Sequence, residues 1–235
     1  MKKSIGFTGN QLKLFAMVCM TFDHMVYLFP FRPNLCVLLR IIGRLAFPIF
    51  AWMIAEGCCH TRSMGRYFGT LALCGLLYQL VYGIFLKSLY MCVMVTFAIS
   101  VGLIWLVQIA KMKKTVLSYV ALFGGLLAAF FASEILPDLL PREWEFAIDY
   151  DFCGIVLPLC VYLCREKWQK LLAAGGVLAL MAAQSLPAQW FALCSLPFLA
   201  LYNGQRGKWK MKWLFYIYYP VHLVVIYGLA LLLYR

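Results

Sequence analysis

The sequence predicts an all-α integral membrane protein, a polytopic bundle of about nine transmembrane helices that forms a single domain over residues 1–235. Composition is the first reason, because 65% of the residues are hydrophobic, 13% are charged and the mean hydropathy is +0.85. Soluble domains are about half apolar and about a quarter charged. The second reason is a series of apolar segments long enough to span a membrane, and the third is an uneven distribution of basic residues.

The apolar segments follow one another along the whole chain and are separated by polar turns. A spanning helix needs about 20 mostly apolar residues. The expected spans are residues 11–29, 35–56, 67–86, 90–110, 115–136, 150–164, 170–186, 188–202 and 212–233. The sixth, seventh and eighth are short, which favours tilted, distorted or partly re-entrant segments. No linker rich in glycine, proline or serine interrupts the series, so one domain is expected.

Basic residues give an independent test of this assignment, because successive loops of a nine-span protein alternate between the two sides. One side collects fourteen of them: Lys2, Lys3, Arg62, Arg66, Lys111, Lys113, Lys114, Arg165, Lys167, Lys170, Arg206, Lys208, Lys210 and Lys212. The other side holds four: Arg32, Lys87, Arg142 and Arg235. Since basic loops stay in the cytoplasm, we expect a multi-pass protein of the cell membrane with a cytoplasmic N-terminus and an outer C-terminus. The net charge of +12 then reports orientation in the lipid bilayer, and no nucleic-acid partner is expected.

Acidic residues show the opposite bias and gather around the long loop between the fifth and sixth spans. They are Glu134, Asp138, Glu143, Glu145, Asp149 and Asp151. A solvated loop explains this cluster, and so does an outer surface that attracts a cationic acceptor such as an amine.

Several classes of protein lack their sequence signals here. The ten cysteines lie mostly in apolar segments, with no CxxC pair and no zinc-finger spacing, so we interpret them as packing residues and expect no metal site. Walker A, GxGxxG and HExxH motifs are missing as well, which leaves ATP-driven transport, dinucleotide chemistry and zinc proteolysis without support.

The first two spans carry ionisable residues at depths where lipid is expected. Asp23 and His24 lie in the outer half of the first span, and Arg40 and Arg44 lie in the second. A charged residue at the centre of a spanning helix costs about 2.5–3.5 kcal/mol, so such groups face a bundle interior or a wet cavity and form pairs. Arg40 and Arg44 are four residues apart and project from one helix face. We therefore expect an ion pair between Asp23 and one of these two arginines.

Two histidines lie inside predicted spans, His24 in the first and His222 in the last. Lys13 precedes His24 by eleven residues, which places both within roughly 20° on one face of the helix and about 16 Å apart along it. An imidazole titrates near neutral pH and is the usual general base. A purely structural ion pair, with Lys13 reaching toward the interface, explains the same residues without any chemistry. Two histidines together with two arginines favour a polar cavity.

The turn between the second and third spans, "AEGCCHTRSMGRYF", contains Glu56, His60, Arg62 and Arg66. Basic residues at such a turn report topology. They also suit the phosphates of a nucleotide-bearing compound that arrives from the cytoplasm.

Five segments resemble, in order, those of the TraX family. They are "QLKLFAMVCMTFDHMVYLF", "LRIIGRLAFPIFAWMIAEG", "VMVTFAISVGL", "DYDFCGIVLPL" and "LALYNGQRG" with "FYIYYPVHL". The namesake of this family of small polytopic proteins acetylates the N-terminus of conjugative pilin. The resemblance runs from about Leu12 to Leu223, and the family is similar in turn to larger membrane acyltransferases that carry acetyl from cytoplasmic acetyl-CoA across the bilayer.

The resemblance implies an acyltransferase that moves an acetyl group from acetyl-CoA, a small-molecule acyl donor, to an amine or hydroxyl near the outer face. A pilin N-terminus or similar protein N-terminus is the implied acceptor. The catalytic candidates are His24, Asp23, Arg40 and Arg44. The candidates for binding the acyl donor are Lys13, Arg62 and Arg66. The candidates for the substrate cavity are His222, Tyr219, Glu56 and Asp149.

The sequence departs from the family pattern at three positions. Cys92 stands where asparagine is common, Val95 stands where an aromatic is common, and Asp151 replaces the glycine of the usual "DYG". These changes bear on the acceptor, so other functions stay open. They are O-acetylation of a glycan or lipid hydroxyl, a non-enzymatic assembly or scaffold role, and a proton-coupled carrier that uses Asp23 and the histidines as a relay.

Overall fold

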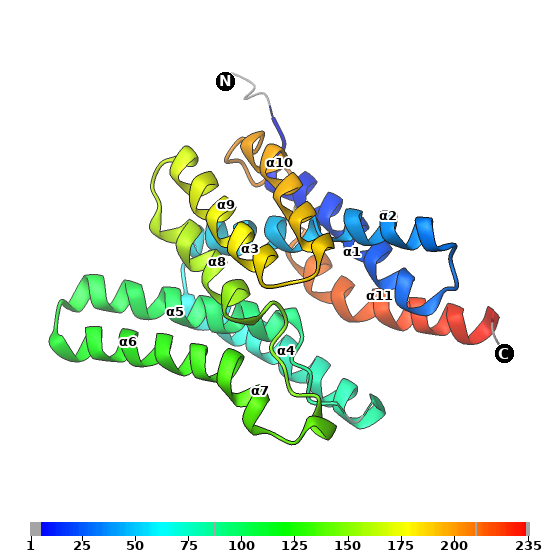
Figure 1. Cartoon of the computed structure of the whole chain (residues 1–235). Coiled ribbons are helices and arrows are strands. Elements are labelled where there is room, and N and C mark those ends of the chain that lie inside the picture. Colours follow the sequence, from blue (N-terminus) through cyan, green and yellow to red (C-terminus); the bar gives the residue numbers. More distant parts are fainter. Residues whose placement is uncertain (1–5, 87, 210, 234–235) are drawn as a thin grey trace. The chain divides into compact units, whose positions relative to one another are not determined.

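The computed structural model describes residues 6–86, 88–209 and 211–233, and this part of the chain is built from helices (Figure 1). Four helical segments are long and apolar enough to cross a membrane: Pro33–His60, Val93–Lys113, Val116–Leu139 and Leu214–Leu233. Asp151–Leu163 is a shorter apolar helix. The all-α prediction is confirmed for the described residues, and the count of nine spans stays a prediction.

The chain divides into two compact units. Residues 1–53 and 174–235 form the first unit, and residues 54–173 form the second. The boundaries fall inside two helices, α3 (Ala46–His60) and α9 (Lys167–Ala183). The single membrane domain stays a prediction, and each unit is described by itself below.

The first unit contains five elements besides the parts of α3 and α9 that belong to it. They are α1 (Gly9–Leu28), α2 (Pro33–Gly43), the 3₁₀ helix η3 (Pro187–Ser195), α10 (Leu196–Ala200) and α11 (Lys212–Leu233). Helix α1, blue in Figure 1, packs against both α2 and the red α11. The predicted eighth span, residues 188–202, is therefore mostly 3₁₀ helix, in line with the expected distortion.

The start of α1 is fixed by partners for the backbone N–H groups that a first helical turn leaves without one. Gly9 and Asn10 donate to the carbonyls of Gln205 and Arg206 at 2.8 and 3.0 Å. The Thr8 hydroxyl accepts from the Gln11 N–H, and the Gln11 side chain accepts from the Thr8 N–H at 2.9 Å, which completes a capping box. These bonds attach the loop before α11 to the first turn of α1.

The second predicted span, residues 35–56, is two helices rather than one. Helix α2 ends at Gly43 and α3 begins at Ala46, with Arg44 and Leu45 between them. Pro48 explains the interruption, because proline has no N–H to donate to the carbonyl four residues earlier and its ring collides with that carbonyl. The carbonyl in question belongs to Arg44, so the break falls at the residue that carries the ion pair described below.

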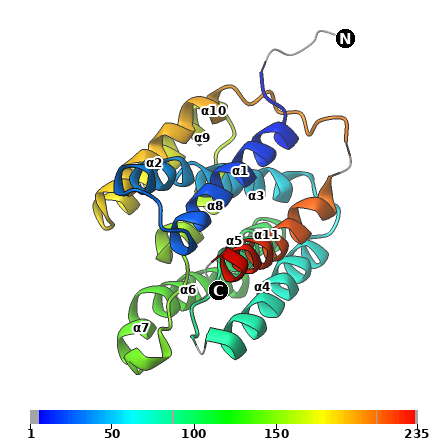
Figure 2. The same ribbon diagram turned by 90° about the vertical axis from the view of Figure 1, so that its right-hand side faces the viewer.

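The second unit is organised around α5 (Val93–Lys113), which packs against three other helices (Figure 2). These are α4 (Met64–Leu86), α6 (Val116–Phe130) and α8 (Asp151–Leu163). A π-helical turn η1 (Phe131–Ile135), α7 (Leu136–Leu139) and a 3₁₀ turn η2 (Arg142–Trp144) lead from α6 toward α8. Two hydroxyls of α5 bond to carbonyls around α8: Thr96 to Asp149 at 2.8 Å and Ser100 to Ile155 at 2.7 Å.

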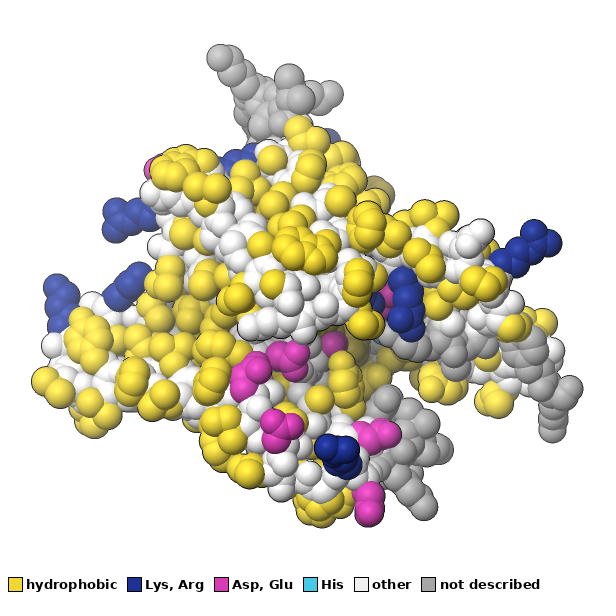
Figure 3. Space-filling view, viewed as in Figure 1, with side chains coloured by type: hydrophobic (Ala, Val, Ile, Leu, Met, Phe, Trp, Pro, Cys, Tyr) yellow, Lys and Arg dark blue, Asp and Glu magenta, His cyan; other side chains and the backbone are white. Residues whose placement is uncertain are grey.

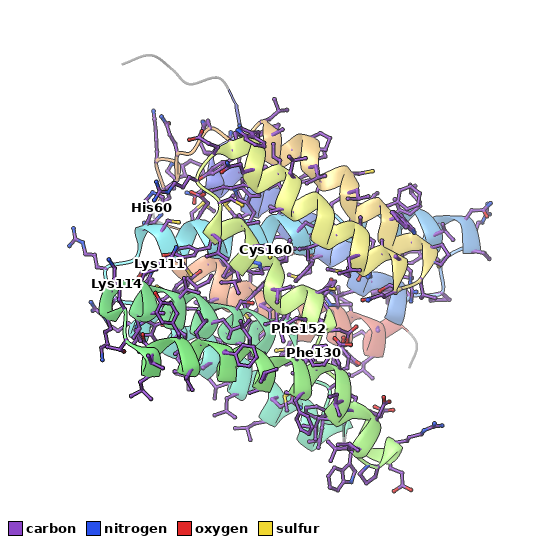
Figure 4. All side chains as sticks on the ribbon, turned by 60° about the vertical axis from the view of Figure 1, so that its left-hand side comes forward. His60, Lys111, Lys114, Phe130, Phe152 and Cys160 are labelled. Atoms are coloured by element: carbon purple, nitrogen blue, oxygen red, sulfur yellow. The ribbon has the colours of Figure 1, made fainter. Side chains whose placement is uncertain are left out.

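The two ends of α6 carry opposite charges. Lys111, Lys113 and Lys114 lie around the turn between α5 and α6, and Figure 4 shows Lys111 and Lys114 at that turn. Acidic side chains gather over α7 and the segment that leads into α8 (Figure 3). Glu134 also has a structural role there, because its carboxylate accepts the Phe152 N–H at 2.8 Å at the first turn of α8. Lys2, Lys3, Lys87, Lys210 and Arg235 lie outside the described residues, so the predicted orientation stays a prediction.

Large apolar side chains cover much of the face that Figure 3 shows. On α6 they include Val116, Leu117 and Phe123, and on α11 they include Val224 and Leu232. A soluble monomer rarely exposes contiguous apolar patches beyond a few hundred Å². Contact with lipid is the environment in which such helix faces are expected.

Candidate functional site

Asp23 lies on α1 and faces the end of α2. One guanidinium nitrogen of Arg44, Nη2, donates to both oxygens of the Asp23 carboxylate at 2.8 and 2.9 Å. The side chains of Arg44 and Asp23 are 20% and 14% exposed, so the pair is mostly withdrawn from the surroundings. Of the two arginines that the sequence offers, the structure therefore pairs Arg44 with Asp23. Arg40 lies one turn earlier on α2 and is half-buried.

Gly43 allows α1 and α2 to approach closely at this pair. A Cβ atom at Gly43 would lie 2.4 Å from Asp23 Cβ and 2.6 Å from Asp23 Oδ1, distances that packed atoms do not adopt. The residue before Arg44 must therefore lack a side chain if Asp23 is to keep its position.

Gln189 of η3 bonds to the second terminal nitrogen of the Arg44 guanidinium. Arg44 Nη1 donates to Gln189 Oε1 at 3.3 Å, and Gln189 Nε2 lies 3.0 Å from the sulfur of Met181. Gln189 is 5% exposed. The Arg44 side chain is thus oriented by a carboxylate on one side and by a buried amide on the other.

His24, the residue after Asp23, faces α11 instead of α2. Its Nδ1 lies 3.2 Å from Nε2 of His222, and the two ring centroids are 5.0 Å apart with the planes inclined by 60°. Each imidazole also uses its own Nδ1 to contact the carbonyl four residues earlier on its helix. His24 Nδ1 lies 2.9 Å from the Met20 oxygen, and His222 Nδ1 lies 2.9 Å from the Tyr218 oxygen.

A second contact joins α1 and α11 beside the two histidines. The phenol ring of Tyr218 is parallel to the His222 ring within 5°, at a centroid distance of 5.1 Å. The Tyr218 hydroxyl is hydrogen-bonded to the Thr21 hydroxyl, and Thr21 lies one turn before His24. Tyr219, a candidate for the cavity, is buried with its ring centroid 5.8 Å from that of His222. The His222 ring is therefore packed against aromatic side chains of its own helix.

The site consequently collects two pairs of groups on one turn of α1. Neighbouring residues of a helix point about 100° apart, which is why Asp23 reaches α2 while His24 reaches α11. An imidazole can accept a proton at one nitrogen and release one from the other. The guanidinium can stabilise an oxygen that gains negative charge. A proton-transfer group and an anion-stabilising group are the two elements that acyl transfer requires.

Lys13 lies toward the start of α1 and also faces α11. Its Nζ is 5.0 Å from the centroid of the Phe215 ring, a cation–π contact. Lys13 and His24 thus share one helix face, as their spacing predicts. Arg206 belongs to the loop that covers the first turn of α1, and its positive charge repels that of Lys13. Two cations therefore lie at the end of α1 away from the histidines.

Four other predicted residues belong to the second unit. Glu56 forms an ion pair with Lys170, at 2.7 Å from Oε1 to Nζ, and both side chains are mostly buried. Asp149 accepts a hydrogen bond from the Tyr90 hydroxyl at 2.7 Å. Arg62 and Arg66 lie around the turn between α3 and α4, where the Arg66 N–H donates to the Ser63 hydroxyl. Predicted roles for these four residues stay predictions.

Other residue classes contribute no alternative centre within the described ranges. All ten cysteines are free thiols, and Cys160 is shown on α8 in Figure 4. Among the residues that the structure describes, no group of three His, Cys, Asp or Glu side chains is placed to hold a metal ion.

Sequence reasoning missed Gly43, Gln189, Thr21 and Tyr218. Gln189 had a usable signal, because an amide in the apolar stretch "LPAQWFAL" needs a partner as an acid does. Gly43 had a weaker signal, a glycine next to an arginine inside an apolar segment. Thr21 and Tyr218 are ordinary residues for such helices, and only the packing of α1 on α11 singles them out.

Comparison with known proteins gives two matches of near full length. The family described as TraX protein matches residues 8–230. The chain is also similar to a protein of Dichelobacter nodosus named "Probable fimbrial assembly protein FimC, serogroup H1". The two are 25% identical over 242 residues, which cover 96% of this chain and 97% of the relative. No solved structure matches the chain.

Proposed function

Because the chain belongs to the TraX family, we propose that it is an integral-membrane acetyltransferase that moves acetyl from acetyl-CoA to an amine. One observation supports this most directly, the histidine pair that lies beside the Asp23–Arg44 ion pair on a single turn of α1. Acyl transfer needs a base for the nucleophile and a positive charge for the carbonyl oxygen. The base lies on this turn, and the Arg44 guanidinium is bonded to it through Asp23.

The acceptor is proposed from the relative in Dichelobacter nodosus, which is named as a probable fimbrial assembly protein. That name favours the N-terminal amine of a fimbrial or pilin subunit, near the outer face of the membrane. A hydroxyl of a glycan or lipid is the second acceptor class, because the same base and the same cation serve an oxygen nucleophile. The name also favours a second function, a non-enzymatic assembly role.

In the proposed reaction the acceptor nitrogen attacks the thioester carbonyl carbon of acetyl-CoA. His24 takes the proton that the nitrogen loses as the new carbon–nitrogen bond forms. The carbon–sulfur bond then breaks, and the departing thiolate recovers the proton from His24. Arg40 or Arg44 stabilises the negative charge on the carbonyl oxygen. Asp23 and Gln189 keep the Arg44 guanidinium in a fixed orientation.

The acyl donor carries several phosphates, and cations bind them well. Lys13 and Arg206 supply positive charge at the start of α1, about 16 Å from His24 along the helix axis. A donor that binds there has to extend its reactive end along α1 to reach the histidines.

The proposal is tested with purified protein in detergent, by acetyl-CoA turnover and by acetyl transfer to a peptide amine. A general base contributes about 10²–10⁴-fold to the rate, so His24→Ala should lower kcat by at least about 100-fold. His60→Ala is the matched control. His60 is exposed, and its Nδ1 makes the same local contact, 2.8 Å from the carbonyl oxygen of Glu56 four residues earlier. It should leave the rate unchanged.

Two results would count against the proposal. Full activity in His24→Ala would remove His24 from the role of base. A folded, monodisperse wild-type protein that neither binds nor turns over acetyl-CoA would replace the enzyme with the assembly factor.

A further inference from the structure

The contacts of the two imidazoles restrict where their protons lie. Three contacts have to be satisfied together: His24 Nδ1 with the Met20 oxygen, His222 Nδ1 with the Tyr218 oxygen, and His24 Nδ1 with His222 Nε2. A carbonyl oxygen can only accept a hydrogen bond, whereas a neutral imidazole has one nitrogen that donates and one that accepts. The two carbonyls therefore require an N–H at Nδ1 in both rings.

The contact between the rings agrees with this assignment and with no other neutral one. With both protons on Nδ1, the His24 N–H is shared between the Met20 oxygen and the lone pair of His222 Nε2. If His24 carried its proton on Nε2, its Nδ1 lone pair would face the Met20 oxygen at 2.9 Å. If His222 carried its proton on Nε2, its Nδ1 lone pair would face the Tyr218 oxygen at 2.9 Å. Each alternative places two hydrogen-bond acceptors face to face with no proton between them, which is unfavourable.

One nitrogen of the pair remains available for chemistry. His222 Nε2 accepts from His24, and both Nδ1 atoms donate to backbone carbonyls. His24 Nε2 then carries a lone pair that none of these three contacts uses. The pair thus presents a single basic nitrogen, and it belongs to the histidine on α1.

We propose that His222 is a positioning residue for His24: together with the Met20 carbonyl it holds His24 in the Nδ1–H form, so that Nε2 is the base, and its Nε2 accepts the hydrogen bond of the imidazolium that forms when His24 takes up a proton. When Nε2 of His24 gains a proton, its Nδ1–H keeps both of its acceptors, the Met20 oxygen and His222 Nε2. The contact between the two rings then persists and becomes stronger, because the donor now carries a positive charge. This inference rests on the proposed acetyl transfer only for the use made of the base.

The surroundings of His222 suit this role. Its ring is stacked on Tyr218 and bonded to the Tyr218 carbonyl, so both the plane and the rotation of the imidazole are fixed from its own helix. The Thr21–Tyr218 hydrogen bond ties that same tyrosine to α1. His222 is 5% exposed, so its Nε2 is screened from water and can accept from His24.

The protons can be observed directly by nitrogen NMR of protein labelled with ¹⁵N-histidine, in detergent near pH 8. The chain has three histidines, so single substitutions of each assign the spectrum completely. We expect His24 and His222 in the Nδ1–H form, with a coupling that reports the bond between the two rings. A wild-type His24 with its proton on Nε2 would overturn the inference, whatever the enzyme does.

Substitutions at His222 supply the second arm of the test. His222→Gln retains a side-chain oxygen that can accept the His24 N–H, whereas His222→Leu retains none. We expect His24 to stay in the Nδ1–H form in the first variant, and to populate the Nε2–H form to a greater extent in the second, where the Met20 oxygen is the one acceptor left of the two. His60→Gln should leave the signals of both other histidines in place.

The activity assay separates this inference from the proposed function. Loss of a positioning residue should appear in kcat and not in KM, with a fall of about 100-fold in His222→Leu that His222→Gln partly restores. Equal kcat in His222→Leu and wild type would overturn the positioning role. If no acetyl transfer is found at all, the NMR result still decides the proton positions while the proposed function fails alone.

Discussion

Replacing Gly43 with alanine tests how closely α1 and α2 must approach for the ion pair to form. The added methyl would lie 2.4 Å from Asp23 Cβ, 2.6 Å from its Oδ1 and 2.7 Å from its Cγ. Carbon atoms in good contact are about 3.5–4.0 Å apart, so either Asp23 or a helix backbone has to move by about 1 Å. Rotation of Asp23 would break its bonds to Arg44 at 2.8 and 2.9 Å.

The expected cost follows from these distances. Overpacking of this kind costs about 1–3 kcal/mol. Inside a helix, replacing glycine with alanine stabilises the helix by up to about 1 kcal/mol. Gly43 is the last residue of α2, so the gain is smaller at this position. A net loss of about 1–3 kcal/mol corresponds to a fall in Tm of about 2–12 °C for a chain of this length.

Gly176→Ala is the matched control in the same unit. Gly176 lies inside α9, is exposed, and has no atom within 4 Å of the position of an added Cβ. Its Tm should stay the same or rise by up to about 4 °C. The assay is thermal unfolding of the purified protein in detergent, with acetyl transfer measured on the same samples.

A double-mutant cycle identifies the atom responsible. Asp23→Gly removes the Cβ that the new methyl would meet, so Gly43→Ala should cost much less in that background than in the wild type. The difference should be about 1–3 kcal/mol, which lies within the range of about 0.5–3 kcal/mol found for residues in contact. Equal costs in the two backgrounds, or a Gly43→Ala protein as stable as Gly176→Ala, would refute the close approach of α1 and α2 at Asp23.

Two further predictions concern stability and use the same unfolding assay. Arg44→Lys should lower the free energy of unfolding by about 1–3 kcal/mol. A lysine ammonium cannot bond to Asp23 and Gln189 at once as the planar guanidinium does. An unchanged Tm would show that these bonds contribute little to stability. Asp151→Gly should raise the free energy of unfolding by about 1 kcal/mol. Asp151 has a φ of +51°, and this conformation costs residues with a side chain about 1–2 kcal/mol. A lower Tm would mean that the Asp151 carboxylate makes a stabilising contact.

The helical segments could be predicted from hydropathy because each needs only a run of apolar residues, and the structure has a helix at every one. Their internal form was harder to predict. The break after Gly43 had its signal in Pro48, four residues after Arg44, but a continuous apolar run obscured it. The 3₁₀ geometry of η3 depends on packing within the first unit, and composition does not report it.

The ionisable residues of the candidate site were also visible in the sequence, because each is costly in a membrane without a partner. Their pairing was only partly visible. Spacing placed Arg40 and Arg44 on one face and gave no reason to prefer either as the partner of Asp23. The choice of Arg44 follows from Gly43 and from Gln189, which comes from a segment 145 residues later in the chain. The contact between His24 and His222 spans 198 residues, and no local pattern encodes it.

The departure at Asp151 shows how a family pattern and a backbone angle explain each other. The resemblance to the family implies glycine at this position, and the structure gives Asp151 a positive φ at the first turn of α8. Glycine adopts that conformation without strain. Since Glu134 already caps the same turn through the Phe152 N–H, the acid at position 151 is not needed to start the helix.

The order Asp23–His24 is itself informative about how the site is assembled. Two adjacent residues on a helix point about 100° apart and face different neighbours. An acid followed by an imidazole therefore contacts two different helices at the same depth of α1. Asp23 bonds to Arg44 at the end of α2, and His24 contacts His222 on α11. Reversing the two residues would turn the carboxylate toward His222 and leave Arg44 without its counter-charge. The dipeptide therefore specifies a junction of three helices, and the chemistry proposed for it depends on that junction.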